Sequence, residues 1–411
     1  MNIHPLQYHY ATLGNGMRVV MCHAPMAVAA HCGVTVRAGS RDEQPDRYGL
    51  AHFVEHTIFK GTLRRRAWHI LNRMERIGGE LNAYTTKEET VVYTTYPAGY
   101  LERAIDLLAD LIENSQFPAN ELERERQVVE DEIDSYLDSP AEGIFDDFDE
   151  LIFAGTPLAH PILGNRKSIA GLDSAICRQW LDDFYRPDNM VLFYYGPEMP
   201  DRVVTVAERH FTRKAPASPI ARPTCVFPKQ AGPIDLTRAI NSHQAHTVLG
   251  TRVPDMYHDD RFALALLTNV LGGPGMNSLL NVALREKRGL VYTVDASTAL
   301  MSDTGLFTIY YGCDREDVDR CRRIITDILC NTLGSALTPR RLAEACRQYE
   351  GQLIIASTNT EQQALAMGRA TLMRGEVMPM PQQLEAINSL TPAALTDTAR
   401  RLMPLSRLSL E

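Results

Sequence analysis

The sequence predicts an α+β fold in two related halves, and three observations support this fold class. Strand-like runs rich in β-branched residues alternate with amphipathic helical segments along the 411 residues. The segment 216–233 contains more proline than a helix or a central strand accepts, so it is predicted to be an extended linker. The order of elements before this linker recurs after it. We therefore expect two homologous domains from an internal duplication, over residues 1–215 and 234–411.

Composition limits the classes of protein to which the chain can belong. A hydrophobic fraction of 45% and a charged fraction of 23% are typical of a globular protein. The net charge of −9, without a basic run, argues against a nucleic-acid partner, and no apolar stretch of about 18 residues indicates a membrane span. The N-terminus lacks a secretory signal, and the eight cysteines are scattered without a C-x-x-C pair. We expect reduced thiols and a cytoplasmic protein.

The first elements of the chain are strands. Asn15-Gly16 is a strong hairpin-turn signal within the first strand-like region. Residues 28–36 form a further run of small and β-branched residues. A polar turn then leads into residues 49–62, which are predicted to form an amphipathic helix ended by Gly61.

This helix carries the motif His-x-x-Glu-His. His52 and His56 are four residues apart and therefore project from one face of the helix, one turn above the other. Two neutral imidazoles at this spacing can bind one zinc ion, which leaves Glu55 free to act on a water activated by the metal. The order is the inverse of His-Glu-x-x-His and is known as the inverzincin motif. Two histidines on a solvated helix face are the alternative interpretation.

The next elements are a helix over about residues 68–77 and, over residues 80–96, two strands joined by a charged turn. The polar segment Asn82-Ala83-Tyr84-Thr85 is suited to expose a strand edge with which an extended peptide pairs. An edge strand that binds nothing is the alternative interpretation.

A third metal ligand is expected from a carboxylate-rich helix over residues 121–133. Zinc enzymes usually combine three protein ligands with one open position. Glu125 and Glu132 are two turns apart and lie nearly above one another on the helix surface. Either is therefore able to reach the metal while the other supports a histidine. An ordinary acidic, solvent-facing helix is the alternative, and helical periodicity leaves all of these interpretations open.

The rest of the first half is less periodic between residues 143 and 188. His160 lies there beside prolines that indicate a loop, so we expect a structural or substrate-lining role for it rather than metal ligation. A strand over residues 190–196 and a helix over about residues 202–211 close this half.

The second half repeats these elements without the metal motif. The helix over residues 262–271 takes the place of the metal helix but contains no His-x-x-Glu-His, and Leu353, not an acid, stands about where the carboxylate ligand would recur. The matching segments are 246–250 with 31–35, 306–312 with 91–97, and the helices over 320–333 and 339–351 with the pair that ends in Glu132. We therefore expect the second domain to bind no metal.

The motif helix and the glutamate-rich helix together resemble the pitrilysin/insulinase metallopeptidases, which include the mitochondrial processing peptidases. In that family a glutamate 76 residues after the second histidine completes the zinc site, and this position is Glu132 here. A glutamate seven residues earlier supports the site, and this position is Glu125. The resemblance thus implies one Zn²⁺ per chain, bound by His52, His56 and Glu132, with Glu55 as the general base. It also implies two domains that are each a mostly antiparallel sheet packed with helices.

The resemblance also implies roles for residues outside the two helices. Residues 284–292 match the family pattern Leu-Arg-Glu-x-x-Gly-Leu-x-Tyr. In the family the arginine and the tyrosine of this pattern reach the active site, where they would stabilise the oxyanion of a tetrahedral intermediate; they are Arg285 and Tyr292 here. Asn82 and Ala83 match the segment at which family members hold the substrate backbone.

These features predict a zinc-dependent metalloendopeptidase that hydrolyses peptides or unfolded polypeptide segments inside an enclosed chamber. Because the chain carries both the zinc motif and the Arg/Tyr pair, we expect a complete homodimer. The alternative is a non-catalytic or partner-dependent subunit of a processing-peptidase-like complex. Family relatives that take such a role often lose the metal motif, which is intact here.

Overall fold

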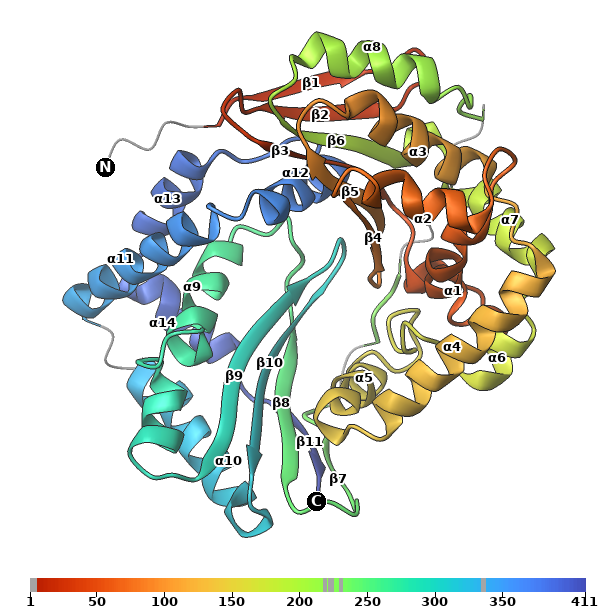
Figure 1. Cartoon of the computed structure of the whole chain (residues 1–411). Helices are drawn as coiled ribbons and strands as arrows, with labels where there is room; N and C mark the ends of the chain where they lie inside the picture. The colour runs from red at the N-terminus through yellow and green to blue at the C-terminus, as the bar shows by residue number, and fades with distance from the viewer. Residues whose placement is uncertain (1–5, 217–219, 221–224, 229–231, 334–337) are drawn as a thin grey trace. The chain divides into compact units, whose positions relative to one another are not determined.

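The computed structural model describes residues 6–216, 220, 225–228, 232–333 and 338–411. Contacts between residues divide the chain into two compact units. Each unit contains a β-sheet with helices packed on it (Figure 1). The first unit comprises Met1–Ser135, His160–Thr224 and Ser357–Pro379, and the second comprises Tyr136–Ala159, Cys225–Ala356 and Met380–Glu411.

The segment Tyr136–Ala159 belongs to the second unit although it lies in the first half of the sequence. Its helix α5 (Pro140–Ile152) buries Ile144, Phe148 and Ile152 in a cluster with apolar residues of the second sheet. These side chains recur every four residues and so form one face of the helix. That apolar face determines where the segment packs.

Conversely, the segment Ser357–Pro379 belongs to the first unit. Its helix α12 (Thr360–Arg374) packs on strands of the first sheet. The division expected from the sequence, 1–215 and 234–411, therefore differs from the observed units by these two segments. Most of the expected linker, 216–233, lies outside the described residues.

Within the described residues, the first sheet has six strands in the order β1-β2-β6-β3-β5-β4. Neighbouring strands are antiparallel, except β2 and β6, which are parallel. The expected turn at Asn15-Gly16 joins β1 to β2, and Gly16 has a φ of +92°, which favours glycine. The strands are β1 (Tyr8–Thr12), β2 (Arg18–His23), β3 (Ala29–Val36), β4 (Glu80–Thr85), β5 (Thr90–Pro97) and β6 (Met190–Gly196).

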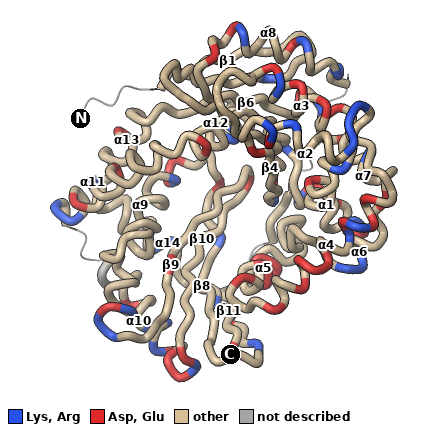
Figure 2. Tube along the Cα trace, in the orientation of Figure 1, with Lys and Arg blue, Asp and Glu red and all other residues tan. Residues whose placement is uncertain are grey.

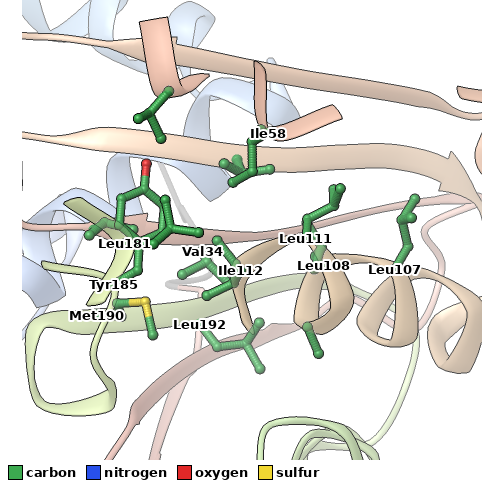
Figure 3. Close-up of a cluster of buried hydrophobic side chains, with 14 of the residues drawn as sticks. Val34, Ile58, Leu107, Leu108, Leu111, Ile112, Leu181, Tyr185, Met190 and Leu192 are labelled. Carbon is green, nitrogen blue, oxygen red and sulfur yellow. The ribbon is translucent and has the colours of Figure 1, made fainter. Parts of the chain in front are cut away.

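Helices cover both faces of the first sheet, with α3 (Leu101–Asn114) and α8 (Pro200–His210) on one face and α12 on the other (Figure 1). Alternate residues of a strand point to opposite faces. Val34 and Leu192 point into a core that they share with leucines of α3 (Figure 3). Thr35 and Phe193 instead lie against Gly368 of α12, where a Cβ atom would come within 2.6 Å of both. The close contact therefore requires glycine at this position of α12.

The helices of the first unit besides α12 are α1 (Leu50–Thr57), α2 (Ala67–Glu75), α3 (Leu101–Asn114), α4 (Ala119–Leu137), α6 (Arg166–Ala170), α7 (Ser174–Phe184) and α8 (Pro200–His210). The last two residues of α4 belong to the second unit. Short 3-10 helices are η1 (Ser40–Asp42), η2 (Pro45–Arg47), η3 (Ile58–Lys60) and η4 (Pro187–Asn189).

In the described part of the second unit, five strands form a sheet in the order β7-β11-β8-β10-β9. The strands are β7 (Asp235–Arg238), β8 (Ala245–Val253), β9 (Val291–Leu300), β10 (Gly305–Cys313) and β11 (Ser406–Leu410). The helices besides α5 are α9 (Arg261–Gly272), α10 (Val318–Asp327), α11 (Pro339–Ala356), α13 (Met380–Asn388) and α14 (Pro392–Arg401). Two π-helices, η5 (Asn281–Glu286) and η7 (Ile328–Leu333), and the 3-10 helix η6 (Arg315–Asp317) complete it.

The two sheets share one topology. The order β2-β6-β3-β5-β4 in the first unit matches β7-β11-β8-β10-β9 in the second. Each sheet has its parallel pair at the same place, β2 with β6 and β7 with β11, and its other pairs are antiparallel. The predicted fold class, two related domains each with a mostly antiparallel sheet packed with helices, is therefore confirmed.

Within the described residues, no helix is both long enough and apolar enough to cross a membrane.

Candidate metal centre

Helix α1 is packed in the core of the first unit, apart from the three polar side chains of its motif. Its apolar side chains are buried in the first unit: Leu50, Phe53 and Val54. His52 is 8% exposed, while Glu55 and His56 are half-buried. Because the apolar face fixes the rotation of the helix, the motif residues point away from the core in a defined direction.

The side chains of His52, His56 and Glu132 converge on one point. Glu132 Oε2 lies 3.7 Å from His52 Nε2 and 3.5 Å from His56 Nε2. All three potential ligand atoms lie within 4.8 Å of one another. Tetrahedral zinc with bonds of about 2.0–2.1 Å separates its ligand atoms by about 3.3–3.4 Å. Two imidazoles and a carboxylate at this spacing therefore fit Zn²⁺.

Glu125 lies behind His56 rather than beside His52. Acidic side chains are spread along α4 (Figure 2), but Glu125 is buried. Its Oε1 lies 3.0 Å from His56 Nδ1, and Lys60 Nζ donates a hydrogen bond of 2.6 Å to its Oε2. With Nδ1 engaged by the carboxylate, His56 presents Nε2 toward Glu132. The two glutamates that helical periodicity left equivalent thus occupy different positions in the fold.

The electrostatic environment keeps His52 neutral and Glu125 charged. Burial, and then the neighbouring His56, lower the pKa of His52 to about 3. Burial also opposes ionisation of Glu125, but hydrogen bonds from His56 and Lys60 outweigh it and lower the pKa of this carboxyl. A metal-binding histidine must be neutral, and a carboxylate that orients one must be ionised. His52 meets the first condition and Glu125 the second. Burial lowers the pKa of His56, but the hydrogen bond to Glu125 and the nearby carboxylates outweigh burial and raise it, so a metal would compete with a proton at His56.

Glu55 lies on the same helix between the two histidines. Burial raises the pKa of its carboxyl, although His56 and a hydrogen bond from Thr85 act against burial. Thr85 Oγ1 donates that hydrogen bond to Glu55 Oε2 over 3.1 Å. A carboxylate with a raised pKa is a better proton acceptor than an exposed one, as a general base requires.

The expected substrate strand is strand β4. It stands at the end of the first sheet and pairs with β5 on one side, so in the described chain its other edge has no strand partner. Asn82 and Ala83 lie in the middle of β4, three and two residues before Thr85, respectively. Since Thr85 contacts Glu55, the free edge leads directly to the polar face of α1.

Arg285 and Tyr292 belong to the second unit. Arg285 is exposed near the end of the π-helix η5. Tyr292 lies in β9, is 57% exposed and donates a hydrogen bond of 3.3 Å to Asp314 Oδ1. The negative charge of Asp314 raises the pKa of Tyr292, so its hydroxyl keeps its proton at neutral pH.

Sequence reasoning missed two supporting residues near the histidines. Lys60 stands four residues after His56, on the same face of a helical turn, and this spacing was available as a signal. Thr85 closes the polar segment of β4, but only the packing of β4 against α1 brings it to Glu55. His160, expected in a loop, is buried and lies 3.1 Å from Glu43.

Models of two sequence families match the chain. The sequence model of the insulinase family, peptidase family M16, matches residues 18–166. The model of the peptidase M16 inactive domain matches residues 175–349. An uncharacterized zinc protease of Bacillus subtilis, YmxG, is 31% identical over 394 residues, which cover 95% of this chain and 94% of the relative.

The chain belongs to peptidase family M16. Another relative of this M16 protein, an uncharacterized zinc protease of Mycobacterium leprae, is 32% identical over 400 residues, covering 95% of the chain and 88% of the relative. Solved structures share the fold. A protease from Helicobacter pylori superposes with a TM-score of 0.93 at 21% identity, over 99% of this chain and 100% of that one. A peptidase M16 inactive domain from Pseudomonas fluorescens gives 0.88 at 19% identity, over 98% of each chain.

Proposed function

We propose that this M16 chain is a zinc metalloendopeptidase. The observation that carries the proposal is the convergence of His52, His56 and Glu132 beside Glu55. The names of its relatives, which describe zinc proteases, support the same assignment. We assign one Zn²⁺ to each chain, held by the two histidines and Glu132.

Bound zinc would supply Lewis acidity toward water and toward the carbonyl of the scissile peptide. Glu55 accepts a proton from the attacking water on its carboxylate and delivers it to the leaving amine nitrogen. The water oxygen forms a bond to the carbonyl carbon, and the C–N bond breaks. Thr85 holds Glu55 in one orientation through its hydroxyl.

The substrate backbone is proposed to pair with the free edge of β4 at Asn82 and Ala83. An extended segment is required for such pairing, which favours peptides and unfolded polypeptides over folded proteins. Because Ala83 and Thr85 are two residues apart, about 7 Å along a strand, a peptide bound at Ala83 is within reach of Glu55.

The roles of Arg285 and Tyr292 rest on the resemblance to the family. We propose that they stabilise the oxyanion of the tetrahedral intermediate, since a guanidinium and a phenol hydroxyl both donate hydrogen bonds. Enclosure of the substrate in a chamber and assembly as a homodimer belong to the same proposal. Light scattering of the purified protein measures the assembly directly.

The decisive experiment compares the wild type with Glu55→Gln. We expect both to hold about one zinc per chain by elemental analysis, and the variant to lose roughly 10²–10⁴-fold in hydrolysis of an unstructured quenched peptide. Glu75→Gln, which changes an exposed glutamate of α2, is the matched control and should cleave normally. Zinc binding without cleavage of any peptide by the wild type would favour the non-catalytic or partner-dependent subunit instead.

A further inference from the structure

Two buried ionisable side chains outside the metal group meet at the start of helix α1. The Glu43 side chain is fully buried, and His160 is 7% exposed. His160 Nε2 lies 3.1 Å from Glu43 Oε2. The two residues are 117 positions apart in the sequence, so folding alone brings them together. The proposed reaction uses neither of them.

Glu43 caps the helix that carries the metal ligands. Its Oε2 accepts a hydrogen bond of 2.8 Å from the Gly49 amide, and its Oε1 accepts one of 2.7 Å from the Ala51 amide. The first amides of a helix have no acceptor within the helix, and Gly49 at the N-cap has no side chain to supply one. Because Ala51 directly precedes His52, this cap acts on the backbone next to a metal ligand.

His160 is itself held in place by the segment that leads into the helix. Its ring stacks on Tyr48 with centroids 3.7 Å apart and an angle of 8° between the planes. Lys87 Nζ donates a hydrogen bond of 2.6 Å to the His160 carbonyl, and Ser168 Oγ donates one of 2.6 Å to the Tyr48 carbonyl. The imidazole therefore has one defined position relative to Glu43.

The backbones of the two segments also touch. Gly49 and Gly164 have positive φ angles of +91° and +70°. A Cβ atom on Gly164 would come within 2.2 Å of the Tyr48 carbonyl oxygen, and one on Gly49 within 2.5 Å of the Leu163 carbonyl oxygen. Both positions therefore require glycine for space as well as for conformation. The loop at His160 and the residues before α1 are therefore closely packed on one another.

We infer that Glu43 and His160 are positioning residues that fix helix α1, so that zinc affinity depends on them. Helix α1 has eight residues, and a helix this short owes its geometry to tertiary contacts rather than to its own stability. The inference rests on the proposed function, because it concerns the metal that this function requires.

Because Glu43 is buried, its carboxylate depends on every hydrogen-bond donor around it. Burial raises the pKa of Glu43, while the hydrogen bonds from His160, Ala51 and Gly49 oppose that effect. Loss of any of these donors leaves a buried carboxylate less well satisfied, which is costly. The cap is therefore sensitive to His160, which acts on α1 through Glu43.

The experiment measures zinc dissociation constants and thermal midpoints for the full-length protein and four variants. Glu43→Gln places an amide N–H against a backbone donor, and His160→Leu removes the partner. His160→Gln restores an N–H donor. His246→Leu is the matched control, since His246 is also 7% exposed and lies 2.9 Å from one hydroxyl, that of Tyr310, but belongs to the second unit.

We expect Glu43→Gln and His160→Leu to bind zinc about 10–100-fold more weakly, as for other residues that orient metal ligands. His160→Gln should recover most of the affinity, and His246→Leu should lose stability while keeping wild-type zinc affinity. Unchanged zinc affinity in Glu43→Gln and His160→Leu, whatever their thermal midpoints, would overturn the inference. If the wild type binds zinc and cleaves no peptide, the proposed function fails while these affinities still decide the inference; if it binds no zinc, both fail.

Discussion

Helices α1 and α9 occupy the same place in two sheets of the same topology, each following the third strand of the shared strand order. Helix α9 is packed by apolar side chains on most of its surface: Ala263, Leu264, Leu266, Leu267 and Leu271. Helix α1 buries one apolar face and devotes the other to His52, Glu55 and His56. The strand order therefore allows a metal site without requiring one.

The larger difference lies in the surroundings of the two helices. Helix α1 is served by buried charged groups, with Glu43 at its start and Glu125 behind its last turn. The N-terminus of α9 has an exposed partner instead, since the Asp260 amide donates a hydrogen bond of 3.1 Å to His258 Nδ1. Buried charges destabilise a fold unless they are paired. The candidate metal site therefore consists of the motif on α1 and of the buried network of charged groups that satisfies it.

Removal of zinc should produce the largest difference between the two units, measured as the rate of amide hydrogen exchange. A ligand present at about a thousandfold its Kd stabilises the state that binds it by about 4 kcal/mol. With a chelator, amide exchange in α1 and α4 should accelerate by up to about a thousandfold, while exchange in α9 stays the same. Hydrogen–deuterium exchange with and without zinc provides the measurement. An equal acceleration in α9 would show that the metal stabilises the whole chain and not only the first unit.

Substitution of a proposed metal ligand should have the next largest effect. His56→Ala removes one of three ligand side chains, so zinc affinity should fall by more than the roughly 10–100-fold typical of an orienting residue. Asn269→Ala, a half-buried polar position on α9, is the matched control and should bind zinc normally. Competition with a fluorescent zinc chelator measures both. Near-normal affinity of His56→Ala would exclude this residue as a ligand.

A smaller effect is expected from Lys60, which touches Glu125 and no proposed ligand. Lys60→Met keeps the length of the side chain and removes its charge, so Glu125 should hold His56 less firmly. We expect zinc affinity to fall about tenfold, at the lower end of the range for such residues. Lys287→Met, at an exposed position of the second unit, should change nothing. No difference between the two variants would remove Lys60 from the supporting network.

The smallest expected effect is the pH dependence of stability that one buried histidine in each unit produces. Burial lowers the pKa of His31, although Glu361 opposes it, and burial lowers the pKa of His246. Each folded pKa then lies below the unfolded value of about 6.5, so protons favour the unfolded state. Stability should be full above about pH 6.5 and decline as the pH falls toward the folded pKa values.

Urea unfolding at about pH 7.5 and pH 5.5 tests this sign. His31→Gln and His246→Gln should each lose less stability on acidification than the wild type does. A wild-type protein that is equally stable at both pH values would contradict the prediction for both units.

The fold was largely predictable because it depends on local patterns that occur twice. The apolar runs that became β3 and β8, and β5 and β10, were matched from the sequence alone, and their pairing confirms the duplication. The positions of α5 and α12 were not predictable in this way. Each helix has an apolar face that fits either sheet in principle, and the choice depends on contacts between residues far apart in the chain.

The candidate site, like the fold, was predictable from the sequence only in part. Helical spacing identified His52 and His56, but it could not separate Glu125 from Glu132, because residues two turns apart share one helix face. The resemblance to a family chose between them. Glu43 and His160 carry no local signal, since their contact spans 117 positions and depends on a loop packed against the start of α1.

The placement of α12 has a consequence for synthesis on the ribosome. One face of the first sheet, with Thr35 and Phe193, is covered by a helix that ends only at Arg374 of 411 residues. Domains usually fold in order as they emerge, the N-terminal one first. Here the unit that carries the metal motif stays uncovered until most of the second unit has been translated. The nascent chain therefore lacks the helix that covers this sheet face from the synthesis of β6, which ends at Gly196, until α12 has been made, and the first unit is complete only near the end of translation.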